Sequence, residues 1–66
     1  MEIAVYFKNG SVAYFKEVEN FSKLIGIDDE AEVSITFDYF GIASQQRKRA
    51  EFYIKNISGY AVTKKD

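Results

Sequence analysis

The chain of 66 residues contains no histidine, cysteine, tryptophan or proline. Without cysteine it can form neither a disulfide bond nor a thiolate metal site. Without histidine it lacks the side chain that most often transfers protons in catalysis near neutral pH. Its serines do not stand in a G-x-S-x-G sequence, and its four glycines are too scattered to form a phosphate-binding loop. We therefore expect a protein that is not an enzyme and that uses no cofactor.

Long apolar runs are also missing. No segment approaches the roughly 18 apolar residues that span a bilayer. Residues 1–4 lack the basic start and the long apolar core of a signal peptide. We expect one domain over residues 1–66, located in the cytoplasm and with no membrane partner. A domain this small and without covalent staples has little net stability, so binding to a partner or to itself is expected.

Aromatic side chains are abundant, with six phenylalanines and five tyrosines making up 17% of the residues. They fall in runs that alternate apolar and polar residues, the pattern of half-buried strands. Such runs cover residues 3–8, 12–15, 33–40, 47–55 and 60–63. We expect a mainly β fold, with α+β as the variant, built as an antiparallel meander or small open barrel of about five strands. The aromatic residues expected in its core are Phe7, Phe15, Phe37 and Phe52.

The first two runs flank Asn9-Gly10, the strongest short-range signal for a β-hairpin. A two-residue turn would place Tyr14 on the same face as Val5. A three-residue loop with a bulge at the glycine would place Phe15 there instead. We favour the second register, because it gathers the apolar side chains on one face and leaves Tyr6 and Tyr14 together on the other.

Residues 17–25 fit two structures. Val18, Phe21 and Leu24 have the spacing of a helical stripe, and Gly26 would end such a helix. The alternation of Phe21 with polar neighbours fits a short strand almost as well. We predict a short helix or helical turn here, leading into an extended segment.

The net charge is −1, but the two halves of the chain differ. Residues 1–38 hold eight acids and three bases, which gives −5, and residues 39–66 hold six bases and two acids, which gives +4. Such asymmetry can produce a bipolar surface that orients a partner, or it can reflect ordinary solvated loops.

The acids gather around the expected turn before residue 33. Held on a rigid hairpin, they could occupy a basic groove that normally holds phosphate, with exposed tyrosines assisting. This candidate contact set is Asp28, Asp29, Glu30, Glu32, Asp38, Tyr6 and Tyr14. We expect no metal site, because the acids lack the glycine and the final bidentate acid of a calcium loop.

The bases gather in the run at residues 47–55. Basic residues interleaved with aromatic residues on a strand can hold single-stranded nucleic acid, although charges on an edge strand also serve simply to prevent aggregation. The residues of this alternative nucleic-acid surface are Arg47, Lys48, Arg49, Tyr53 and Lys55. A second alternative is a structural homodimer formed by sheet edges and aromatic side chains.

Four short patterns spread along most of the chain carry a family resemblance. They are Ile3-x-Val5-Tyr6-Phe7-Lys8-Asn9-Gly10, Phe15-x-x-Val18, Ala50-Glu51-Phe52 and Ile57-x-Gly59-Tyr60. In these the chain resembles small uncharacterised β-rich proteins of Gram-positive phages, prophages and other mobile elements. The resemblance implies a non-enzymatic accessory protein, a class that includes anti-CRISPR proteins and other inhibitors of host defence. Our leading hypothesis is therefore a protein-binding inhibitor of a nucleic-acid-handling host protein.

Overall fold

The computed structural model describes residues 1–28 and 31–64 of the chain. Over these residues the fold is mainly β, as the alternating sequence predicts, with six strands and one short 3-10 helix. The elements are β1 (Glu2–Phe7), β2 (Val12–Phe15), β3 (Glu19–Ile25), β4 (Glu32–Gly41), β5 (Gln46–Tyr53), η1 (Ile54–Asn56) and β6 (Ile57–Thr63). No helix in these ranges is long and apolar enough to cross a membrane.

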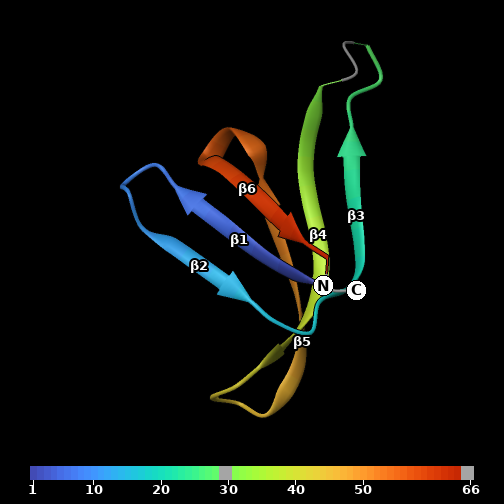
Figure 1. The fold of residues 1–66 in the computed structure, drawn as a ribbon. Coiled ribbons are helices and arrows are strands. Elements are labelled where there is room, and N and C mark those ends of the chain that lie inside the picture. Colours follow the sequence, from blue (N-terminus) through green and yellow to red (C-terminus); the bar gives the residue numbers. More distant parts are fainter. Residues whose placement is uncertain (29–30, 65–66) are drawn as a thin grey trace.

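The strands form two antiparallel sheets of three strands each (Figure 1). Sheet A has the order β2-β1-β6, and sheet B has the order β3-β4-β5. The chain is therefore more than a simple meander, because its last strand returns to pair with its first. This closure lets the inner face of sheet A cover the inner face of sheet B, which a single sheet of this length could not do.

The hairpin between β1 and β2 has the three-residue loop that we favoured. The amide of Phe7 donates to the carbonyl of Ser11 at 2.9 Å, and Gly10 has a φ of +91°, which glycine adopts without strain. The Asn9 side chain accepts the amide hydrogen bond of Ser11 at 2.9 Å and fixes the loop further. The predicted register is thus confirmed.

In this register Val5 pairs with Ala13, and Ile3 pairs with Phe15, on the inner face of sheet A. Tyr6 and Tyr14 consequently lie on its outer face, as expected, and both are exposed. The sequence alone therefore places these two tyrosines correctly.

The helical turn expected at residues 17–25 is wrong, because this segment forms strand β3 along β4. Glu17 and Asn20 have positive φ angles of 53° and 56°, which a right-handed helix does not permit. Between them, Val18 turns its side chain into the core and donates its amide to the carbonyl of Met1 at 3.0 Å. Pairing with β4 satisfies more backbone groups than an isolated two-turn helix would. The single helical turn of the described residues is η1, which begins in the last two residues of the run 47–55 that was expected to be strand.

The core lies between the two sheets. Its fully buried apolar residues are Ile3, Val5, Val18, Ile35, Phe37 and Ile57. Aromatic rings surround them: Phe37 lies 5.1 Å from Phe15 of sheet A and 6.1 Å from Phe52 of β5, measured between ring centroids. Phe7, also partly buried, lies 6.0 Å from Phe52. The predicted aromatic core is confirmed.

Ile35→Val tests the tightness of this core. Ile35 is completely buried, so loss of one methylene should lower the free energy of unfolding by about 0.5–1.5 kcal/mol. The measurement is the midpoint of urea denaturation followed by circular dichroism. Ile27→Val is the matched control, since Ile27 is 97% exposed and its change should stay within about 0.5 kcal/mol. Equal effects of the two substitutions would contradict the core assignment.

Candidate functional site

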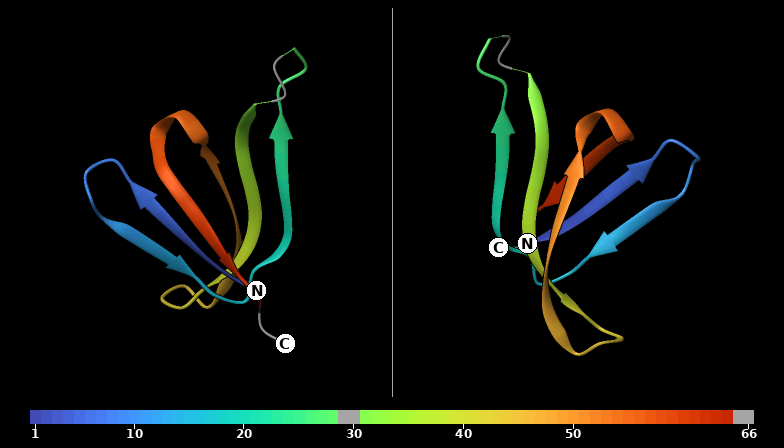
Figure 2. Two further views of the ribbon diagram at one scale, coloured as in Figure 1. Left: turned by 45° about the horizontal axis from the view of Figure 1, so that its top comes forward. Right: turned by 180° about the vertical axis from the view of Figure 1, so that it is seen from behind.

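The hairpin formed by β3 and β4 extends beyond the other strands (Figure 2). Its tip is closed by the amide of Gly26, which donates to the carbonyl of Ala31 at 2.8 Å. The apolar side chains of this tip have no second layer over them. They are Leu24 (58% exposed), Ile25 (44%), Ile27 (97%) and Val33 (39%). We call these four residues the apolar tip.

The sequence pattern does not reveal the apolar tip, because Leu24 fits the helical stripe predicted for residues 17–25. A run of apolar residues normally indicates burial, and here the strands are longer than the body that could cover them. The one available signal is Ile27, an isolated apolar residue placed directly before the acidic Asp28. Large exposed apolar side chains that cluster mark interaction sites more often than scattered ones do.

The structure divides the predicted acidic contact set among separate places. Asp28 is exposed beside the apolar tip and makes no side-chain hydrogen bond or ion pair within residues 1–28 and 31–64. Asp29 and Glu30 lie outside the described residues. Glu32 begins β4 and Asp38 lies further along the same strand, and each already has internal partners. Of the described acids, only Asp28 is placed to meet an external cation beside the tip.

Glu32 joins the projecting hairpin to sheet A. Its carboxylate lies 3.1 Å from the ammonium of Lys23 on β3, and it accepts the hydroxyl of Tyr60 on β6 at 3.1 and 3.2 Å. The hydrogen bond from Lys23 holds the pKa of Glu32 below its ordinary value and raises the pKa of Lys23. Burial, followed by the hydrogen bond to Glu32, raises the pKa of Tyr60. This cluster links β3 and β4 of sheet B to β6 of sheet A.

Asp38 occupies the outer face of sheet B. It accepts a hydrogen bond from the Asn20 amide at 2.8 Å and forms an ion pair with Arg49 at 3.2 Å. These two contacts, that of Asn20 first, lower the pKa of Asp38. Arg49 also donates to the Thr36 hydroxyl at 3.3 Å. Asp38 therefore already has two partners within the sheet.

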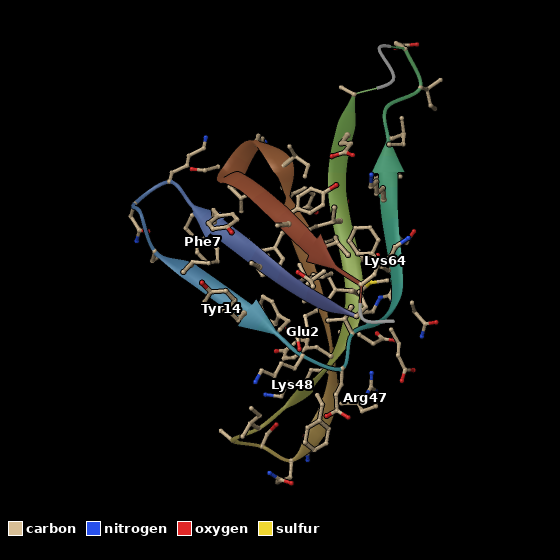
Figure 3. The ribbon with its side chains drawn as sticks, viewed as in Figure 1. Glu2, Phe7, Tyr14, Arg47, Lys48 and Lys64 are labelled. Carbon is tan, nitrogen blue, oxygen red and sulfur yellow. The ribbon has the colours of Figure 1, made fainter. Side chains whose placement is uncertain are left out.

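The predicted nucleic-acid surface is likewise held by internal contacts. Arg47 donates to the carbonyl of Glu17 at 3.0 Å and lies 3.8 Å from Glu19, while Arg49 is bound to Asp38. Tyr53 shares the outer face with them and is exposed, whereas Lys55 belongs to η1. Lys48 leaves β5 on the opposite side from Arg47 (Figure 3). Arg47, Lys48 and Arg49 nevertheless line one open hollow of about 330 Å³ together with Asp38, whereas Tyr53 and Lys55 are not part of its lining.

Tyr6 and Tyr14 are distant from the acids in the fold, because they belong to the outer face of sheet A. Around them lies a shallow hollow of about 190 Å³ that includes Ala4 and Ala61, which face each other across β1 and β6. Tyr14 is the more exposed of the two, at 72%. They form a second aromatic surface, separate from the apolar tip.

Within the residues that the structure describes, no group of three or more Asp or Glu side chains could hold a metal ion. No protein-family model, curated protein or solved structure matches the chain. The candidate site is therefore defined by the geometry alone: an exposed apolar tip with Asp28 beside it, on a hairpin held to the body by Glu32.

Glu32→Gln tests the anchoring of the hairpin. A carboxyl group whose pKa is lowered by folding stabilises the folded state above its unfolded pKa and loses this contribution as the pH falls. The wild-type stability should therefore decline as the pH drops below about 4, the ordinary range of carboxyl groups. In Glu32→Gln this decline should be shallower, as measured by urea midpoints between about pH 7 and pH 3.

Asp28→Asn is the control, because Asp28 has no internal partner among the described residues. It should keep the wild-type dependence on pH. A Glu32→Gln protein that declined as steeply as the wild type would show that the cluster with Lys23 and Tyr60 does not stabilise the fold.

Proposed function

We propose that the protein is a non-enzymatic binding module that inserts its apolar tip into a groove of a partner protein. The observation that carries the proposal is the exposure of Ile27, at 97%, together with Leu24 at 58% on the same projecting hairpin. Burying such side chains at an interface contributes about 25 cal/mol per Å² of apolar surface. In the free chain this surface is left in water at the end of a rigid two-stranded arm.

The charge beside the tip supports a partner groove with a basic rim. Asp28 is available next to Ile27, and the sequence continues with Asp29 and Glu30 before Ala31. Complementary charge of this kind speeds association and rejects wrong partners more than it adds affinity. A groove that is both apolar and basic is what a nucleic-acid-binding protein offers, with its stacking residues and its phosphate contacts side by side.

The resemblance to small phage and prophage proteins supports the biological side of the proposal. We infer an inhibitor from a mobile element, of the anti-CRISPR kind, that blocks a nucleic-acid-handling host protein in the cytoplasm by occupying its surface. Catalysis is not part of the proposal, because the chain has no histidine and no cysteine. Occupying a surface needs only complementarity, which a domain this small can supply.

The first test replaces Ile27 at the tip with the photo-crosslinking residue benzoylphenylalanine (Ile27→benzoylphenylalanine). The tagged protein is then added to host-cell lysate. Irradiation should join one host protein to the tag, and treatment with nuclease should not remove it. With that partner purified, Ile27→Ser should weaken the affinity by about thirtyfold or more, the size expected for an interface hot spot. Calorimetry or biosensor kinetics would give the value.

Ile42→Ser is the matched control, since Ile42 is 70% exposed in the turn between β4 and β5, at the other end of the molecule. It should bind the partner as the wild type does. The combined Asp28→Asn, Asp29→Asn and Glu30→Gln protein should associate more slowly and with less dependence on salt. Equal weakening by Ile27→Ser and Ile42→Ser, or crosslinking only to a second copy of the chain, would overturn the proposal.

A further inference from the structure

A hollow of about 190 Å³ lies where the end of β2 meets the end of β4. Its walls come from residues 14–16 and 39–42, so it lies at the end of β4 that is opposite the apolar tip. Tyr14 forms one wall and is 72% exposed. Tyr39 forms another, and its ring is held 4.9 Å from the ring of Phe15. The exposed Tyr14 can thus close over a ligand, whereas Tyr39 is held in place by its contact with Phe15.

One lysine lines this hollow, and a second stands beside it on another strand. The second, Lys48, lines a neighbouring hollow with Asp38, Arg47 and Arg49. Lys16 directly follows β2 and lines the hollow, and Lys48 of β5 stands opposite Tyr39 across the strand pair. The Cε of Lys48 lies 3.6 Å from the position that a Cβ on Gly41 would take, so its side chain runs over a wall of the hollow. Figure 3 shows Lys48 on the same side of β5 as Tyr14. Within residues 1–28 and 31–64 neither lysine has an ion pair, and no acid lines the hollow.

The size of the hollow limits what can enter it. It is smaller than the roughly 300 Å³ at which sites for whole small molecules begin, so it admits about one planar ring. A ring with anionic groups on either side matches a base with its flanking phosphates, which proteins hold by stacking and by lysine. We propose that this hollow binds single-stranded nucleic acid, one base stacking on Tyr14 and the adjacent phosphates contacting Lys16 and Lys48.

This site differs from the surface predicted from the sequence. There, Arg47 lies 3.8 Å from Glu19 and Arg49 lies 3.2 Å from Asp38, so that a phosphate would compete with an internal partner. At the hollow, the two lysines can accept a phosphate without breaking a contact between described residues. Only Lys48 is shared between the two sets. The hollow also stands apart from the apolar tip, so its occupation does not depend on the proposed protein partner.

The test titrates the intact chain into a fluorescein-labelled oligothymidylate of about ten nucleotides and follows fluorescence anisotropy at several salt concentrations. Binding should be saturable, and log affinity should fall against log salt with a slope of about −1.4, since each phosphate contact on a single strand contributes about 0.7. Lys16→Gln combined with Lys48→Gln should remove most of this slope. Tyr14→Ala should weaken binding about tenfold through lost stacking.

The matched controls are Tyr53→Ala and Lys55→Gln, one exposed tyrosine and one exposed lysine from the sequence-predicted surface. Both should bind as the wild type does, as should Ile27→Ser at the far end. All of these positions are on the surface, and unchanged urea midpoints would confirm that each variant folds. Absence of saturable binding would overturn the proposal, and so would a larger loss in Tyr53→Ala than in Tyr14→Ala. Equal affinity for a glutamate- and tyrosine-rich peptide would assign the hollow to an acidic protein segment instead.

Discussion

The packing of aromatic rings around Phe37 is the interaction on which the rest of the structure depends. Phe37 is completely buried, and its neighbours Phe15 and Phe52 come from different sheets, so these rings hold the two sheets together. A buried ring removes roughly 150–250 Å² of surface from water. A few aromatic residues can therefore stabilise this small domain, as disulfide bonds do in others. Because the core consists of so few residues, the outer faces of the sheets and the β3–β4 hairpin are left exposed.

The pairing of strands brings acidic and basic side chains together. Acids of the first half of the sequence meet bases of the second half across sheet B, as in the contact of Asp38 with Arg49 and that of Glu19 with Arg47. These two surface ion pairs offset part of the imbalance between the halves. Asp28 near one end of β4, and Lys16 and Lys48 near the other, make no ion pair with described residues. The same holds for Glu17, Glu51, Lys55 and Lys64, so the charges without an ion pair are spread over the surface.

The strands, the aromatic core and the first hairpin follow from local patterns, because alternation and the Asn9-Gly10 turn fix them within a few residues. The structure of segment 19–25 does not follow from local patterns, since its apolar spacing fits both helix and strand. The free edge of β4 selects the strand by pairing with it. The positive φ at Glu17 has no signal in the residue type, whereas asparagine, as at Asn20, adopts such angles more readily than most residues. The candidate sites could not be predicted from the sequence. Ile27 and Lys16 can be recognised as site residues only when the positions of the strand ends are known.

The two proposed sites are held apart by the strand that they share. β4 has ten residues, and at about 3.3 Å per residue it spans about 30 Å, most of the 39 Å length of the molecule. Each site uses side chains that project from an end of this strand or its neighbours, with the rigid core between them. A partner protein at the apolar tip would therefore leave the hollow open to a nucleic acid. Coupling between distant sites needs an element with two arrangements. The ladder of β4 with β5 pairs residue by residue from Ser34 to Gly41, although that of β4 with β3 has two register shifts, and we expect the two bindings to be energetically independent.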